Sequence, residues 1–207
     1  MHERNLLYDY RLLFLSYWER VIDMLNKKSL AAAILLALTQ TPSFASDTVF
    51  GADSYSGEFA TGNKTKIVRG GLQWNWAEEW FKSNGTHLGG YWDATIAQWQ
   101  GNAYQGVAGA KQNITDIGIT PVWRFQNDSK KGLYAEGAVG FHLLSHVYNN
   151  NGRGFSTAFQ FGDHLGVGYV FDNGWDLALK AQHFSNGAIK HPNPGVNLAV
   201  LKLGHAF

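Results

Sequence analysis

Apolar and polar residues alternate with a period of two along most of the chain after residue 46, in stretches separated by turn-forming clusters. This alternation is typical of β-strands with one apolar and one polar face, and no stretch shows helical periodicity over a useful length. The pattern predicts eight strands, which run over residues 47–60, 65–80, 87–99, 114–126, 133–145, 155–171, 175–185 and 197–207.

The connections between these strands alternate in length. Tight turns of the Asn/Asp/Gly kind are expected at 82–86, 127–132 and 172–174, and longer loops at 100–113, 146–154 and 186–196, with one short connection at 61–64 on the loop side. Short turns on one side and longer loops on the other are typical of an even-stranded barrel of the bacterial outer membrane.

Alternation alone fits two classes of fold. In the fifth predicted strand, Leu133, Val139 and Leu143 share one side. Glu136 and His142 share the other side, where we expect them to join an interior polar network. A soluble sandwich or lipocalin-like protein hides its apolar face in a core, whereas a small transmembrane barrel exposes that face to lipid. The choice between the two classes needs other observations.

The front of the chain predicts export. Met24 is followed by two lysines, an apolar run and a small-x-small end at 43–45, which is the pattern of a signal peptide. The apolar run is far shorter than the roughly 20 residues that a membrane-spanning helix needs. We expect residues 1–23 to be an over-long start, with an amphipathic segment that is really made as the alternative. Residues 24–45 are expected to be a cleaved signal peptide, and residues 46–207 to form the barrel.

Composition favours the membrane and excludes several functions. The chain has 24 Gly and 8 Trp, 14% of its residues are aromatic, and it ends on an aromatic strand at Phe207. Aromatic residues near strand ends are typical of interfacial girdles, and the last strand resembles the assembly signal of outer-membrane barrels. The formal net charge of +1, without a basic run, argues against a nucleic-acid partner. The absence of Cys leaves no disulfide and no thiolate metal site.

We therefore predict an all-β, eight-stranded antiparallel transmembrane β-barrel of the bacterial outer membrane. Outer-membrane lipid and the barrel assembly machinery are the expected partners of such a chain. No HExxH motif, metal-ligand cluster or phosphate-binding glycine loop is present, so we expect neither a metal nor a cofactor.

A candidate catalytic pair closes the seventh predicted strand. The odd positions of this strand, from Trp175 to Leu179, are apolar, and the same side ends in His183 and Ser185 near the outer rim. Residues two apart on a strand have Cα atoms roughly 6.5 to 7 Å apart on one face, so an imidazole can reach a hydroxyl. A base-activated serine that faces lipid is feasible, although His and Ser are also common as polar girdle residues.

The string HFSNGAIKHPNPGVN, residues 183–197, resembles the signature of the PagL-type lipid A 3-O-deacylases. In that family a His-x-Ser-Asn stretch on a late strand is followed by an Asn-x-Gly loop, and the similarity extends to signal peptide, size and strand count. The resemblance implies that Ser185 is the nucleophile and His183 the general base. It also implies that Asn186, with a backbone N–H such as that of Gly187, stabilises the oxyanion.

One position departs from the family's pattern. The glutamate that orients the histidine is expected near the start of the last strand, where this chain has Asn197, and no Asp or Glu follows Asp176. An asparagine oxygen can hold an imidazole N–H but supplies no charge to the imidazolium. Asn197 is therefore the candidate orienter, with an acid from a neighbouring strand as the alternative. Asp163 and His164 are adjacent, so they point to opposite faces and make a poor catalytic or metal pair.

The preferred hypothesis is an outer-membrane serine esterase that removes the ester-linked 3-hydroxyacyl chain at position 3 of lipid A. Lys190, Asn193 and Arg153 in the outer loops are candidate contacts for the lipopolysaccharide substrate, with solvated loop charges as the alternative. Two other hypotheses stay open: a structural or adhesive barrel with a degenerate site, and an acyltransferase or phospholipase on the same scaffold. A homodimer that covers the site is also left open.

Overall fold

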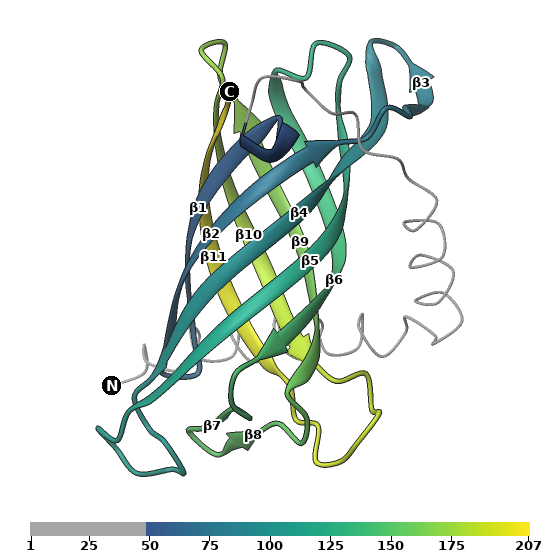
Figure 1. Cartoon of the computed structure of the whole chain (residues 1–207). Coiled ribbons are helices and arrows are strands. Elements are labelled where there is room, and N and C mark those ends of the chain that lie inside the picture. Colours follow the sequence, from purple (N-terminus) through teal and green to yellow (C-terminus); the bar gives the residue numbers. More distant parts are fainter. Residues whose placement is uncertain (1–48) are drawn as a thin grey trace, which may run out of the picture. The chain divides into compact units, whose positions relative to one another are not determined.

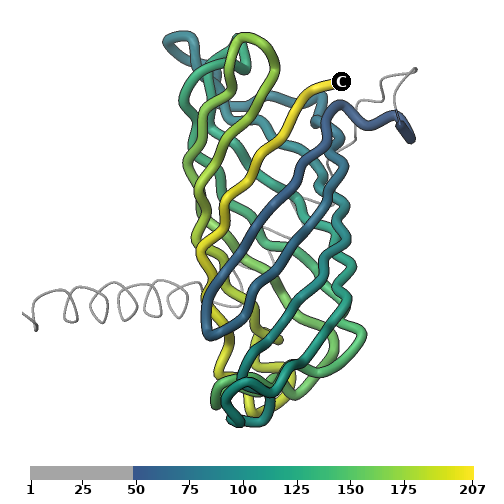
Figure 2. The backbone as a smooth tube through the Cα atoms, turned by 90° about the vertical axis from the view of Figure 1, so that its left-hand side faces the viewer, coloured from purple at the N-terminus to yellow at the C-terminus, as the bar shows by residue number. Residues whose placement is uncertain are grey.

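The computed structural model of this chain describes residues 49–207, so the predicted over-long start (1–23) and signal peptide (24–45) lie outside the described residues. Eight long strands form one antiparallel sheet that closes on itself (Figures 1 and 2). They are β1 (Ser54–Gly62), β2 (Thr65–Asn75), β4 (Thr86–Gly101), β5 (Gln112–Asn127), β6 (Gly132–Leu144), β9 (Phe159–Val170), β10 (Trp175–Ser185) and β11 (Val196–Ala206).

The barrel closes between the first and last strands. Strand β1 pairs with both β2 and β11, and β2 pairs on its other side with β4, so every long strand has two neighbours. Among the described residues, no helix is long and apolar enough to cross a membrane. The prediction of an eight-stranded antiparallel barrel is confirmed.

Three predicted strands differ from the structure by four residues or more at one end. The sixth is one of them, because β9 begins at Phe159 instead of residue 155. The first strand begins at Ser54 because Val49–Gly51 form a 3-10 turn, in which Phe50 takes a φ of 54° that no strand allows. The second strand ends at Asn75 instead of continuing to residue 80, and the short strand β3 (Trp80–Ser83) follows after a break.

The break after β2 is built around Trp76. Its backbone N–H donates to the carbonyl of Gly90 at 2.9 Å, and its buried ring covers Gly90, where any Cβ would collide with it. The rings of Trp80, Trp92 and Trp123 surround it at centroid distances of 5.6–6.4 Å. This aromatic cluster takes the chain out of the regular ladder, although the alternation of residue types continues as far as Trp76.

The connections divide the barrel into two ends. The long connections 102–111, 145–158 and 186–195 gather at the end opposite the C-terminus, called the loop end here (Figure 1). Phe207 and the tight turns that follow β3, β5 and β9 lie at the other end, called the turn end. A predicted loop contains a small hairpin of β7 (Asn149–Asn150) and β8 (Arg153–Gly154) at the loop end.

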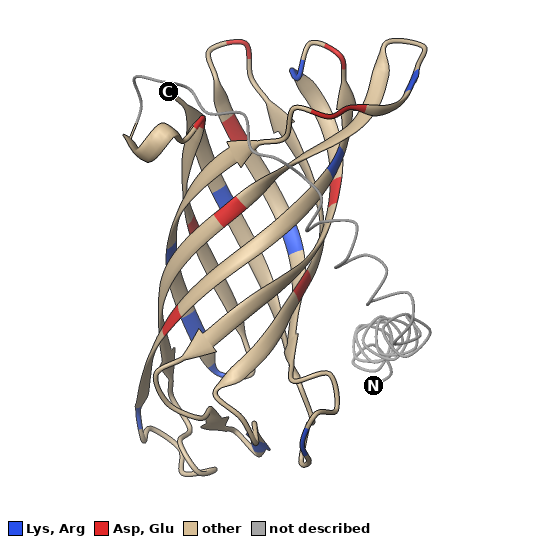
Figure 3. Cartoon of the chain, turned by 45° about the vertical axis from the view of Figure 1, so that its right-hand side comes forward, with Lys and Arg blue, Asp and Glu red and all other residues tan. Residues whose placement is uncertain are grey.

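Inside the barrel, the side chains change character along its length. The middle and the turn end hold paired charges, among them Arg69 with Glu58 at 2.7 Å and Lys180 with Glu58 at 2.8 Å. Acidic and basic residues accordingly lie on neighbouring strands (Figure 3). Buried charges are tolerated only when they are paired and hydrogen-bonded, which explains why the buried Glu58 lies beside basic side chains of other strands. Near the loop end the interior also contains an apolar cluster, which includes the rings of Trp99 and Phe184, 4.7 Å apart.

Candidate active site

The two faces of β10 separate the candidate pair from the barrel interior. Residues at even positions, from Asp176 through Lys180 to Phe184, are buried. Residues at odd positions are exposed or half-buried, and the 63% exposed Leu179 shares this outer side with His183 and Ser185. His183 and Ser185 therefore lie on the outer side of the barrel wall, at the end of the strand nearest the loop end.

Asn197 on β11 is the direct cross-strand partner of His183. Nδ1 of His183 lies 2.5 Å from Oδ1 of Asn197. An amide oxygen is only an acceptor, so this contact fits a proton on Nδ1 of the ring. The structure thus brings together His183 and the residue predicted to orient it.

The loop before β11 approaches the imidazole through Gly195. A Cβ at this position would lie 2.7 Å from Nε2 of His183, and the backbone has a φ of 62°, which favours glycine. Arg153 fixes this part of the loop, because its Nη1 donates to the carbonyls of Pro194 at 2.6 Å and Gly195 at 3.2 Å. Backbone packing and one arginine therefore limit where the imidazole can lie.

Asn186 lies on the inner side, unlike its neighbour Ser185. Its side-chain Nδ2 donates to Ser156 Oγ at 2.9 Å and to the carbonyl of Lys190 at 2.7 Å. Its backbone N–H donates to Oδ1 of Asn193 at 3.0 Å. In this structure Asn186 holds the loop together, and its part in stabilising an oxyanion stays a prediction.

Gly187 follows the candidate nucleophile by two residues and has a φ of 62°, as does Ala188. The side of Gly187 where a Cβ would stand faces the ring of Phe161, which is also the cross-strand partner of Ser185. These two consecutive residues have a left-handed backbone conformation, which turns the chain sharply away from β10. The backbone N–H groups in this turn are the candidate donors near Ser185.

The loop residues predicted to contact substrate surround this site. Lys190 is exposed, and its carbonyl accepts hydrogen bonds from Ser156 at 2.7 Å and from Asn186. Asn193 is half-buried against Asn186, and Arg153 is half-buried against the loop before β11. Two cationic side chains and one amide therefore belong to the loops that border His183 and Ser185.

The interior directly behind the pair is filled. Phe184, between the two candidate residues in sequence, is fully buried against Trp99 and His142, with centroid distances of 4.7 Å and 4.9 Å. Val196 and Leu198 of β11 belong to the same apolar cluster. Phe184 thus closes the barrel wall behind the outer face on which His183 and Ser185 lie.

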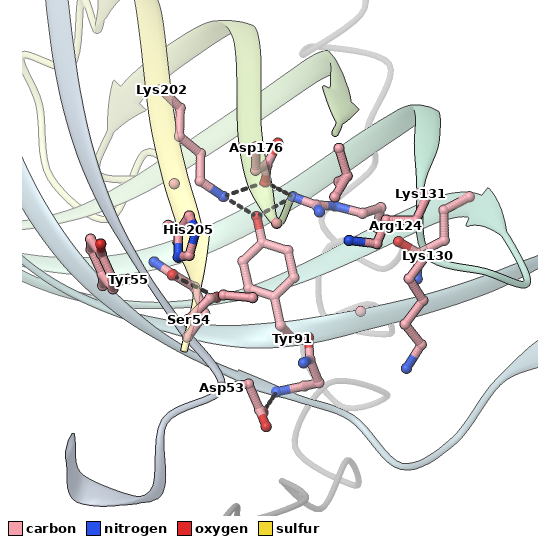
Figure 4. Close-up of a pocket in the computed structure, with 18 residues that line it drawn as sticks. Asp53, Ser54, Tyr55, Tyr91, Arg124, Lys130, Lys131, Asp176, Lys202 and His205 are labelled. Atoms are coloured by element: carbon pink, nitrogen blue, oxygen red, sulfur yellow. Dashed lines mark hydrogen bonds and ion pairs between the residues drawn. The ribbon is translucent and has the colours of Figure 1, made fainter. Parts of the chain in front are cut away.

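A cavity of about 220 Å³ lies at the turn end, far along the barrel from this pair. Tyr91, Arg124, Asp176 and Lys202 point toward one another in it (Figure 4). The hydroxyl of Tyr91 accepts from Arg124 and Lys202, each at 3.2 Å, and donates to Glu136 at 3.0 Å. Because the groups that line this cavity pair among themselves, we interpret them as a structural polar network and not as a second candidate site.

Glu136 and His142 were expected in an interior polar network, and both are buried inside the barrel. They belong to different networks, because Glu136 pairs with Arg124 at 2.8 Å, whereas Nδ1 of His142 bonds Asp116 at 3.0 Å. No group of three or more His, Cys, Asp or Glu within residues 49–207 is arranged to hold a metal ion.

One acid near the pair was not identified from the sequence. Asp163 on β9 is the cross-strand partner of His183, on the side opposite Asn197. The alternation correctly separates it from His164, which is buried inside, but strand alternation carries no information on register. Asp163 could have been identified by pairing β9 with β10 as a hairpin about the turn at 172–174, because that register sets it opposite His183.

Most of the chain, and not only this site, is similar to known proteins. The family model for lipid A 3-O-deacylase (PagL) matches residues 66–206. The chain belongs to this family. Lipid A deacylase PagL of Pseudomonas aeruginosa is 31% identical over 170 residues, which are 82% of this chain and 93% of that protein. Lipid A deacylase PagL of Bordetella bronchiseptica is 30% identical over 117 residues, 56% of this chain and 58% of that protein.

The fold agrees with this assignment. The crystal structure of the outer membrane enzyme PagL superposes with a TM-score of 0.64 and 23% identity, over 74% of this chain and 99% of that one. Membership of the PagL family confirms the predictions of an outer-membrane β-barrel and of an ester hydrolase, and the resemblance found in residues 183–197 was correct.

Proposed function

We propose that this PagL-family barrel hydrolyses the ester-linked 3-hydroxyacyl chain at position 3 of lipid A, with Ser185 as nucleophile and His183 as general base. The observation that carries the proposal is the contact of His183 Nδ1 with Asn197, on the same outer face as Ser185. The names of the relatives, lipid A deacylases, supply the substrate class.

The proposed reaction is acyl transfer to serine followed by hydrolysis. Nε2 of His183 takes the proton of Ser185 as Oγ attacks the ester carbonyl, and the resulting imidazolium then protonates the departing sugar oxygen. Water, deprotonated by the same nitrogen, cleaves the acyl-enzyme and releases a 3-hydroxy fatty acid. The backbone N–H of Gly187 is the proposed oxyanion donor. Asn186, whose N–H groups bond Ser156, Lys190 and Asn193, supports that loop from the inner side instead of donating to the oxyanion.

The proposed site faces lipid, which makes a pocket unnecessary. Its residues stand on the outer side of the wall, Leu179 on the same side is exposed, and Phe184 and Trp99 fill the interior behind them. A substrate that is itself a component of the bilayer reaches this face by lateral diffusion. Lys190, Asn193 and Arg153 then lie at the depth of the phosphates and sugars of lipopolysaccharide, which cationic and amide groups bind well.

The proposal includes one protein partner, the barrel assembly machinery, and leaves a homodimer open. A barrel of this class needs the barrel assembly machinery, and we propose that the last strand, β11, ending beside Phe207, carries its recognition signal. A homodimer is compatible with the proposal only where it leaves the outer face of β10 accessible to lipid.

Product analysis with the purified, folded barrel and lipid A tests the proposal. Release of one free 3-hydroxy fatty acid per lipid A is the expected result. Transfer of the chain to another lipid would instead indicate an acyltransferase, and cleavage of glycerophospholipid alone a phospholipase. The absence of any product would favour a structural barrel and contradict the proposal.

Asn197→Glu is expected to raise kcat, because a carboxylate at the position of the amide oxygen would hold the same N–H and also stabilise the imidazolium. We expect a gain of about threefold to tenfold, since a charged acceptor strengthens a hydrogen bond about twofold in energy. Steady-state kinetics on lipid A measure the change. Unchanged or lost hydrolysis in a folded Asn197→Glu protein would show that Asn197 is not the third member of the triad.

A further inference from the structure

Asp163 is the acidic residue closest in register to the candidate catalytic histidine. The pairing of β9 with β10 sets it directly opposite His183, and the pairing of β6 with β9 sets Val139 on its other side. Cross-strand partners share a face and have Cβ atoms roughly 4.5 to 5.5 Å apart. Asp163 and Asn197 therefore flank His183 on its two sides, in one row across β9, β10 and β11.

The carboxyl group of Asp163 has an unusual environment. Its Oδ1 is buried and has no hydrogen-bond partner among the described residues. Along β9 its neighbours on the same face are Phe161 and Leu165, and across β6 it faces Val139. The polar side chains on this face next to Asp163 are those of β10, His183 directly opposite and Ser185 on the diagonal.

A carboxylate with a buried oxygen that has no hydrogen-bond partner is costly in the resting protein. That cost is offset when a cation forms beside it, and the imidazolium of His183 is such a cation, present only after Ser185 has lost its proton. An interaction that strengthens only as the reaction proceeds lowers the barrier without tightening the binding of the substrate.

We propose that Asp163 supplies the negative charge of the catalytic site, while Asn197 supplies the hydrogen bond that fixes the imidazole. This inference rests on the proposed Ser–His mechanism. Asp163 is a positioning residue in this account: it acts through His183, by stabilising the charged ring, and contacts neither the ester nor the nucleophile. The two roles that one glutamate would combine are thus divided between residues on the two strands that flank β10.

A double-mutant cycle between the two flanking positions tests this division. Asp163→Asn is expected to lower kcat by about 10- to 100-fold with KM changed less than about twofold, because the charge on the cross-strand partner of the imidazolium is lost while the contact of Nδ1 with Asn197 is kept. Asn197→Glu returns a charge to the same ring, so its gain in kcat should be at least about fivefold larger in the Asp163→Asn background than in the wild type. Asp172→Asn, in the exposed turn at the turn end, is the matched control and should leave kcat unchanged.

The outcomes separate the inference from the proposed function. A folded wild type that releases no 3-hydroxy acid would contradict the function itself. An active wild type with an equally active Asp163→Asn variant, or equal gains from Asn197→Glu in both backgrounds, would overturn the role of Asp163 alone. If Asp163→Asn does not fold, Asp163→Glu decides: it keeps the charge and should retain at least about a third of kcat, and a loss of tenfold or more in a folded protein would overturn the proposal.

Discussion

Replacing His183 by Gln is expected to lower the rate of lipid A hydrolysis by at least ~10³-fold, because the loss of the base in a serine–histidine unit costs nearly as much as the loss of the whole unit. Gln has a similar reach and can still bond Asn197, so the barrel should fold normally. Initial rates with purified protein, with folding checked by heat-modifiable mobility, measure the effect.

The matched control for this variant is His146→Gln. His146 is an exposed histidine at the loop end and contacts Ser145, so its replacement changes the same chemical group without touching the site. Its rate should stay within about twofold of the wild type. A His183→Gln protein that retains a tenth of the activity would contradict a base at this position.

Gly195→Ala is expected to lower kcat by about 100-fold, the second large effect. The added Cβ would lie 2.7 Å from Nε2 of His183, so the ring must move, and a displacement of about 1 Å at a reacting group costs on the order of a hundredfold in rate. Steady-state kinetics on lipid A should show the loss in kcat, with the amount of folded barrel unchanged.

The control for Gly195→Ala is Gly152→Ala. Gly152 also has a positive φ, of 73°, in a connection at the loop end, but a Cβ there would meet nothing within 4 Å. Its replacement introduces the backbone strain without the collision, and it should leave kcat within about twofold of the wild type. Equal losses in the two variants would show that backbone strain, and not the contact with the imidazole, explains the effect.

The strands were predictable because side chains in the barrel wall point alternately to the interior and to the outside. Alternation placed β10 at residues 175–185, where the structure also has it, and assigned His183 and Ser185 to the outer side with Leu179. The rule failed after Asn75, because Trp76 keeps the alternation of residue types while its ring needs the space above Gly90. Such a requirement depends on a residue distant in sequence, so local pattern carries no sign of it.

The candidate site was predictable only as far as it is local. His183 and Ser185 are two residues apart, and the position of Asn197 followed from a family motif within the same 15-residue string. Asp163 lies 20 residues before His183, and only the register of β9 with β10 brings them together. The inward orientation of Asn186, with its amide hydrogens bonded to Ser156 and Lys190, likewise depends on contacts between loops.

Mass spectrometry of lipid A from outer membranes that carry either the wild-type protein or Ser185→Ala decides whether Ser185 is the nucleophile of a lipid A 3-O-deacylase. We expect the wild type alone to remove one 3-hydroxyacyl chain, from position 3, while Ser185→Ala leaves lipid A intact at an equal amount of folded barrel. Identical lipid A in both membranes, or loss of the chain in both, would contradict Ser185 as the nucleophile of a lipid A 3-O-deacylase.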